Sequence, residues 1–234
     1  MKYMGSKARY AKEIIAAISK EVDIKNSTWV EPFCGGCNII DKVKTKRRIG
    51  NDINYYIIKM FQAVQNGWKP PEEVSEECYL AIKMRKEFYA PELVAFVAIG
   101  CSYSGKWFGG YARGNTNKGI PRNYCLESRN NLLKQAENLK SVELYSGDYR
   151  EFKIPTNSCI YNDIPYAKTT KYKDQFDHVS FWKWCDSMLE KGHKVFVSEY
   201  NAPDGWRCIW EKEVCSSLTK ETGSKKAIER LFTK

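Results

Sequence analysis

Apolar residues recur along this chain at a helical period in some segments and as short unbroken runs in others. Residues 8–22 follow the i, i+3, i+4, i+7, i+11 spacing of an amphipathic helix, with a face formed by Ala11, Ile14, Ile15, Ile18 and Val22. Buried strands are expected over residues 27–33, which end at two glycines, and over residues 48–52, which end in an acid. A second helical face follows over residues 53–64.

The same alternation of strands and helices is expected in the second half of the chain. Strands are expected over residues 142–145, 158–163 and 194–200, and a helix carrying Phe181, Cys185 and Met188 lies between the last two. The tail, residues 220–234, is rich in lysine and is expected to form a surface helix. Alternating strands and helices predict an α/β fold with a mostly parallel sheet.

A middle stretch interrupts this alternation. After Pro70-Pro71, helical segments are expected near residues 75–102 and 127–140, separated by the sequence SGKWFGGYARGNTNKGIPRNY. Between residues 100 and 140 there are seven Lys and Arg against two Glu, a net charge of +5 out of +10 for the whole chain. Residues 67–140 therefore read as an insertion with its own function, between catalytic parts formed by residues 1–66 and 141–234.

Composition narrows the class of protein. With 234 residues, 43% of them hydrophobic, the chain has enough apolar material for a packed core, which excludes a disordered segment. The positive charge is typical of proteins that meet a polyanion. The longest apolar run, residues 93–101, is about half of what a membrane span needs, and residues 1–10 lack the apolar region of a secretion signal. No membrane association is expected.

The nine cysteines mostly lie alone among apolar neighbours, as expected of thiols in a reducing cytoplasm. Only Cys34 and Cys37 form a CxxC pair, and the two histidines, His178 and His193, are distant from it with the wrong spacing. No metal site is expected.

Two motifs stand at the ends of the first two strands. The sequence EPFCGG, residues 31–36, places two glycines where the chain must turn, which lets a ligand approach the backbone at the carboxyl end of a strand. About twenty residues on, NDIN places Asp52 where a carboxylate can accept both hydroxyls of a ribose. The alternatives are a plain tight turn and a helix N-cap at Asp52.

A third motif follows the strand at residues 158–163. Asp163 supplies a carboxylate, Pro165 confines Ile164 to an extended conformation and so orients its carbonyl, and Tyr166 offers a flat aromatic face. Together they form an acceptor pair beside a stacking surface. The alternative is a strand that ends in an ordinary proline turn.

In order, YMGSK at residues 3–7, EPFCGG, NDIN, a basic insertion, SGDY at residues 146–149 and DIPY at residues 163–166 resemble the Dam-type DNA adenine N6-methyltransferases. These enzymes form the alpha group of the D12 class, and the GKWFGGYARG stretch resembles its compact, phage-like members. The resemblance covers nearly the whole chain. It implies a Rossmann-like S-adenosylmethionine-dependent methyltransferase sheet with a small, mainly helical recognition insertion.

The resemblance also implies roles for individual residues. S-adenosylmethionine would lie near Tyr3, Gly5 and Lys7, in a cradle formed by Phe33 and Gly35, with Asp52 on the ribose and Asp148 by the adenine ring. The catalytic residues would be Asp163, Ile164, Pro165 and Tyr166, and Asp163 would also border the cofactor. Double-stranded DNA would be the partner, and candidates for its contacts are Lys106, Trp107, Tyr111, Arg113, Lys118 and Arg122.

One position departs from the family pattern. The family's catalytic box is Asp-Pro-Pro-Tyr, and Ile164 stands at its first proline. The carbonyl can still serve as acceptor, but Ile164 must be held by Pro165 and by packing. An active adenine methyltransferase is expected, acting in restriction–modification or phage DNA modification in a bacterial host's cytoplasm. The alternatives are a catalytically decayed DNA-binding homologue and a cytosine N4 methyltransferase. A monomer is expected, with a dimer on DNA as the alternative.

Overall fold

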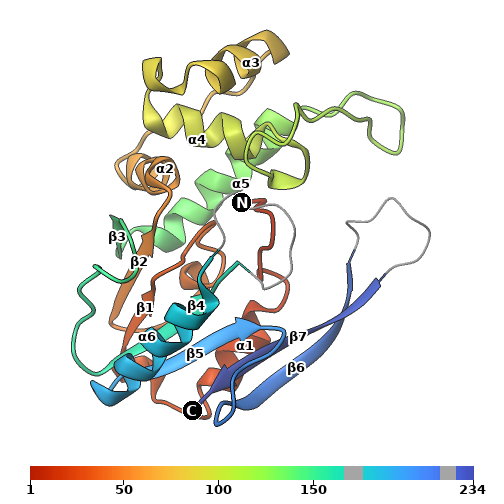
Figure 1. Cartoon of the computed structure of the whole chain (residues 1–234). Helices are drawn as coiled ribbons and strands as arrows, with labels where there is room; N and C mark the ends of the chain where they lie inside the picture. Colours follow the sequence, from red (N-terminus) through yellow and green to blue (C-terminus); the bar gives the residue numbers. More distant parts are fainter. Residues whose placement is uncertain (166–175, 217–224) are drawn as a thin grey trace.

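The computed structural model describes residues 1–165, 176–216 and 225–234, and a seven-stranded sheet forms its centre (Figure 1). The strand order is β3-β2-β1-β4-β5-β7-β6. The strands are β1 (Thr28–Glu31), β2 (Arg47–Asp52), β3 (Val142–Ser146), β4 (Ser158–Asp163), β5 (Lys194–Glu199), β6 (Arg207–Ser216) and β7 (Lys225–Thr233). The strands expected near residues 27–33, 48–52, 142–145, 158–163 and 194–200 are confirmed.

The first five strands of the sheet run parallel. Strand β1 pairs with β2 on one side and with β4 on the other, so the order of the chain reverses between β1 and β4. In open α/β sheets, ligands bind outside the carboxyl ends of strands at such a reversal. The ends of β1, β2 and β4, which carry the three motifs, therefore meet at one edge. The predicted α/β class with a Rossmann-like sheet is confirmed.

Helices cover both faces of the sheet, because strand side chains alternate between the faces. Trp29, Tyr161 and Phe196 enter the core beneath α1, α2, α4 and α5, whereas Val30 and Ile160 enter the core beneath α6. The helices are α1 (Ala11–Ile18), α2 (Tyr55–Gln65), α3 (Glu76–Met84), α4 (Pro91–Gly100), α5 (Tyr124–Leu139) and α6 (His178–Glu190).

The middle stretch shares the larger of these cores. The apolar run at residues 93–101 forms most of α4, which packs on α2 and is buried from Val94 to Gly100. Pro91 begins this helix at a position where a missing N–H costs nothing. The segment predicted near residues 75–102 is therefore two helices, α3 and α4.

The chain between α4 and α5 leaves the helical body and returns to it (Figure 1). Its base is held by two tyrosines. The hydroxyl of Tyr79 on α3 lies 2.8 Å from that of Ser102, and the hydroxyl of Tyr111 donates to the Val74 carbonyl at 2.6 Å. Isolated bridges pair Ser102 with Tyr111 and Asn115 with Pro121. We refer to residues 101–123 as the excursion.

The prediction of a helix over residues 220–234 is wrong, because the described part of this tail forms β7. Leu231 and Phe232 are both buried, in the cores on opposite faces of the sheet, which is the alternation of a strand. Pairing with β5 from Phe196 to Glu199 uses only the end of β7, and pairing with β6 uses all of it. The β6–β7 hairpin consequently projects beyond β5 (Figure 1).

The packing of α2 makes a quantitative prediction. Phe61→Ala should lower the free energy of unfolding by about 3–5 kcal/mol, because the ring is fully buried and its loss leaves a cavity. Urea denaturation measures this change. Ile53→Ala, at a side chain that is 76% exposed, is the control and should stay within about 0.5 kcal/mol of the wild type. Equal effects of the two changes would contradict the core assignment.

Candidate functional site

The turn after β1 is fastened to the end of β2. The Cys34 N–H donates to the Asn51 carbonyl at 2.8 Å, and the Gly35 N–H donates to Asp52 Oδ2 at 2.8 Å. Gly35 has φ +44°, a conformation that strains residues with a side chain. Asn51 adds a third connection, because its Nδ2 donates to the carbonyls of Pro32 and Gly147. The ends of β1, β2 and β3 are thus joined around the predicted cofactor motif.

Asp52 is a half-buried carboxylate held by backbone donors. Its Oδ1 accepts from the Asn54 N–H at 2.9 Å, while Oδ2 accepts from Gly35. Burial raises the pKa of Asp52, and these two hydrogen bonds oppose the rise. The N-cap of α2 is Asn54, whose side chain accepts a hydrogen bond from the Ile57 N–H. Asp52 is therefore not the N-cap of this helix. Each carboxylate oxygen keeps a lone pair and can accept a further hydroxyl.

The N-terminal segment lies on the glycine turn. A Cβ on Gly35 would lie 2.9 Å from Tyr3 Cε1, and one on Gly36 would lie 2.7 Å from Tyr3 Cβ. On its other side this segment meets the excursion, since the Met4 N–H donates to the Gly105 carbonyl at 3.2 Å. Gly5 follows with φ +81°, and its carbonyl accepts from Lys7 Nζ at 3.4 Å. Tyr3, Gly5, Lys7 and Gly35 are therefore brought together.

Lys7 connects this segment to the predicted catalytic motif. Its Nζ lies 3.3 Å from Asp163 Oδ1, at the end of β4, and 3.5 Å from Glu229 Oε2, on β7. The side chain of Lys7 is 7% exposed, so this ion pair lies in a protected environment. Burial alone would lower the pKa of Lys7, but the two carboxylates outweigh it and raise that pKa.

The same contacts act on Asp163 in opposite directions. Burial raises the pKa of Asp163, the positive charge of Lys7 lowers it, and the negative charge of Glu229 adds to the rise. Burial raises the pKa of Glu31 and of Tyr161, and the negative charge of Asp163 adds to both rises. Among the described residues, Lys7 is the cation that stabilises the charge of Asp163.

Ile164 turns its side chain away from this edge. It is 3% exposed and belongs to the core beneath α6, together with Phe181 and Val197. This burial is the packing that the sequence requires in place of the missing proline. Pro165 is half-buried and ends the described part of the motif, while Tyr166 lies outside the described residues.

Phe33 and Asp148 border the site on the β3 side. The Phe33 ring lies 4.9 Å from that of Tyr149 and 5.7 Å from that of Phe181, measured between centroids. Asp148 accepts from Arg150 Nε at 3.0 Å, and this contact lowers the pKa of Asp148. Asp148 also lines a surface hollow of about 470 Å³ with Asn51 and Gly147, at the ends of β2 and β3.

The six candidates for DNA contact all lie on the excursion, in different states. Trp107 is half-buried, and its ring centroid lies 5.9 Å from that of Tyr56. The Tyr111 hydroxyl donates to the Val74 carbonyl. Both aromatic residues therefore help to hold the excursion in place. The other four candidates are half-buried or exposed: Lys106, Arg113, Lys118 and Arg122.

The two arginines of this group have acidic partners. Arg113 pairs with Glu76 of α3, and Arg122 Nε lies 2.8 Å from Glu127 Oε1 of α5. The guanidinium of Arg122 also lies 4.7 Å above the Tyr124 ring. These contacts use Nη2 of Arg113 and Nε and Nη2 of Arg122, so other N–H donors of each guanidinium are left for a further contact.

Sequence reasoning missed two residues of the site, Glu229 and Gln135. Glu229 falls in the tail that was expected to be a helix, so no pattern placed it near Lys7. Gln135 is a polar residue on the buried side of α5, where it is 5% exposed. A polar residue at a buried helical position is the one signal that could have marked it.

Comparison with known proteins identifies the first part of the chain. Residues 3–94 match the family described as D12 class N6 adenine-specific DNA methyltransferase. The resemblance drawn from the sequence is confirmed over this segment. It contains the YMGSK, EPFCGG and NDIN motifs, and ends before the excursion and β4.

Two individual proteins extend the comparison. The Modification methylase StsI of Streptococcus sanguinis is 28% identical over 212 residues, which cover 80% of this chain and 32% of that protein. The chain thus spans about a third of the length of this relative. The crystal structure of SMU.472 complexed with SAH has a TM-score of 0.34 at 12% identity and covers 97% of this chain and 53% of that one. At that TM-score, the fold assignment rests on strand order alone.

The described residues contain neither a candidate metal site nor a candidate membrane-spanning helix. Within residues 1–165, 176–216 and 225–234, no three His, Cys, Asp or Glu side chains gather as metal ligands would. Over the same ranges, no helix is long and apolar enough to cross a membrane.

The contact between Tyr3 and the glycine turn can be tested. Gly36→Ala should lower the free energy of unfolding by about 1–3 kcal/mol, because its Cβ would lie 2.7 Å from both Tyr3 Cβ and Asn38 Nδ2. Gly147→Ala is the matched control, since a Cβ there meets nothing within 4 Å. Denaturation curves of the two variants that coincide would show that the N-terminal segment does not rest on this turn.

Proposed function

We propose that this chain is a site-specific DNA methyltransferase that transfers a methyl group from S-adenosylmethionine to adenine N6 in double-stranded DNA. The observation that carries the proposal is the meeting, at one sheet edge, of the glycine turn closed by Asp52 with the Asp163 carboxylate held by Lys7. The family match over residues 3–94 supports the same class of reaction. Asp163 and the excursion lie outside that match, so their roles rest on geometry and sequence.

The residues at this edge fit the cofactor. Asp52 has acceptor capacity for a ribose diol, and the absence of a side chain at Gly35 lets the Tyr3 ring lie directly against the turn. A buried donor, Asn38 Nδ2, has no hydrogen-bond partner among the described residues, as expected where a ligand supplies the acceptor. Tyr3, Gly5, Lys7 and Phe33 would border the cofactor, and Asp148 would lie by its adenine ring. When bound, S-adenosylmethionine supplies an electrophilic methyl group.

The acceptors then act on the target amine. The lone pair of an exocyclic amine is delocalised into the ring, so the nitrogen is a poor nucleophile. The Asp163 carboxylate and the Ile164 carbonyl would each accept one amine hydrogen, which draws the nitrogen toward sp³ geometry and frees its lone pair for in-line attack. Pro165 orients the Ile164 carbonyl. The amine loses one proton on methylation, and the Asp163 carboxylate that accepts its hydrogen bond would take up this proton and pass it to water.

The base must leave the duplex to reach this edge, and Tyr166 is the residue proposed to stack on it. The insertion, residues 67–140, would bind DNA, with phosphate contacts from Lys106, Arg113, Lys118 and Arg122 near Trp107 and Tyr111. Residues 1–66 and 141–234 would form the catalytic domain. We propose that the protein acts as a monomer in the cytoplasm of a bacterial host. Sedimentation in the presence and in the absence of DNA distinguishes a monomer from a dimer.

Methyl incorporation tests the activity. Wild-type protein and Ile164→Pro should transfer tritiated methyl groups from S-adenosylmethionine to duplex DNA, and Asp163→Asn should lower the rate by about 100-fold or more, as loss of a polar contact to the reacting group does. No incorporation by either the wild type or Ile164→Pro would refute the proposal. Salt-sensitive DNA binding without turnover would instead identify a decayed homologue, which the Ile164 departure makes the second candidate.

Mass spectrometry of digested nucleosides identifies the methylated base. N6-methyladenine is the expected product. N4-methylcytosine in its place would contradict the proposal and support the cytosine N4 methyltransferase alternative. Sequencing of modified bases in DNA from expressing cells gives the recognition sequence.

The ion pairs at Lys7 predict a pH dependence. As pH falls, kcat/KM should drop when Asp163 is protonated, at a pH above that of an ordinary aspartate because burial raises its pKa. Lys7→Met removes the charge that lowers this pKa, so the acid limb should move to higher pH. Glu229→Gln removes a charge that raises it, so the limb should move to lower pH. Shifts in the same direction would contradict this account.

A further inference from the structure

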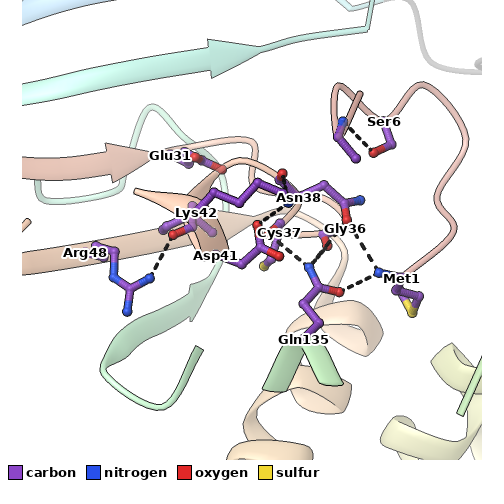
Figure 2. A network of polar contacts seen from close by, with 12 residues as sticks. Met1, Ser6, Glu31, Gly36, Cys37, Asn38, Asp41, Lys42, Arg48 and Gln135 are labelled. Carbon is purple, nitrogen blue, oxygen red and sulfur yellow. Dashed lines mark hydrogen bonds and ion pairs between the residues drawn. The ribbon is translucent and has the colours of Figure 1, made fainter. Parts of the chain in front are cut away.

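Gln135 joins α5 to the turn that forms the proposed cofactor cradle. Figure 2 shows its side chain extending from the helix to residues 36–38. Its Nε2 donates to the carbonyls of Gly36 and Cys37, both at 3.0 Å, and lies 3.4 Å from Asn38 Oδ1. Its Oε1 accepts from the Met1 amino group at 2.7 Å. All of the polar atoms of this buried amide are therefore engaged.

The turn needs such a support. Cys37 has φ +53°, the left-handed region that residues with a side chain seldom adopt. Carbonyls buried here require donors, and Gln135 supplies one amide group to two of them. Without these donors, the strained backbone at Cys37 would relax. The shift would include Gly36, which lies next to Gly35.

Asn38 extends the arrangement toward the cradle. Its Oδ1 faces Gln135, which leaves Nδ2 on the other side of the amide. A Cβ on Gly36 would lie 2.7 Å from that Nδ2, so the atom lies directly against the glycine turn. The Asn38 side chain is buried, and Nδ2 has no partner among the described residues. Gln135 thus orients an unused donor at the cradle.

The helix that carries Gln135 also continues from the excursion. Arg122 pairs with Glu127 in the first turn of α5 and stacks on Tyr124. Ser128 then fastens the helix to α4, because its hydroxyl donates to the Gly100 carbonyl at 2.7 Å. One rigid helix therefore joins the proposed DNA-binding segment to the proposed cofactor cradle.

We infer that Gln135 is a positioning residue for S-adenosylmethionine, which holds residues 36–38 in their binding conformation and orients Asn38 Nδ2 toward the cofactor. The inference rests on the proposed function. It assigns a role in cofactor binding to a residue outside the cofactor motifs, on the helix that ends the insertion.

Gln65 offers a matched control. It lies on α2, and its Nε2 also donates to two backbone carbonyls, those of Leu139 at 2.6 Å and Val142 at 2.8 Å. Gln135→Met and Gln65→Met each remove two side-chain hydrogen bonds to backbone carbonyls with little change in volume, and Gln135→Met also removes the contacts with Met1 and Asn38. Urea denaturation measures the stability that each variant loses, and cofactor binding is compared where both variants are folded, so that a difference in Kd reports the position of the glutamine.

Calorimetric titration with S-adenosylmethionine and S-adenosylhomocysteine measures this difference. Gln135→Met should weaken binding of both ligands by about tenfold, a loss expected when a binding group shifts by a fraction of an ångström, whereas Gln65→Met should keep the wild-type Kd. An unchanged Kd for Gln135→Met, or equal losses in both variants, overturns the inference. Wild-type protein that binds neither ligand refutes the proposed function instead.

Hydrogen exchange of the wild-type protein tests the inference without a variant. Binding of S-adenosylhomocysteine should slow amide exchange in residues 128–139 of α5 as well as in residues 33–38. Protection confined to the turn, with α5 unchanged, would overturn the connection through Gln135.

Discussion

The arrangement of the site depends on one buried lysine between two carboxylates. Lys7 lies within 3.5 Å of Asp163 on β4 and of Glu229 on β7. Removing charges from water is costly unless they are paired, so the burial of Lys7 requires the two carboxylates. The N-terminal segment is thereby fastened to the sheet edge, which brings Tyr3 onto the glycine turn and Met4 against the excursion. Lys7 thus links β4, β7 and the proposed cofactor cradle.

The cradle itself is closed from three directions. Asp52 accepts from Gly35 on the β2 side, Asn51 joins the turn to the loop after β3, and Gln135 holds its far end from α5. Within the turn, the Cys37 N–H donates to the Cys34 carbonyl at 2.7 Å. A glycine-rich segment has little conformational preference of its own, so the polar groups around the turn add to this one internal contact in fixing its shape.

The proposed DNA-binding surface differs in character. Its arginines are paired with Glu76 and Glu127 near the surface, where ion pairs contribute little to stability. Phosphate could replace these carboxylates at small cost, and the exchange would leave the excursion's base unchanged, because Tyr79 and Tyr111 hold it through hydrogen bonds. The side chains that hold the base of the excursion are therefore different from the arginines that are proposed to bind phosphate.

The sequence alone determined what local patterns report. Apolar periods placed the parallel strands and most helices, and the residues at strand ends placed Gly35, Asp52 and Asp163 at one edge, because parallel strands share that edge. The tertiary structure decided which distant side chains meet there. Glu229 was hidden because β7 exists only through pairing with β5 and β6, and a lysine-rich tail carries no such signal. Gln135 lies 99 residues from Gly36, and the packing of α5 against α2, α4 and the segment Ile40–Lys42 brings them together. Spacing along a chain records the backbone's own period, whereas contacts across the fold depend on how the helices cover the sheet.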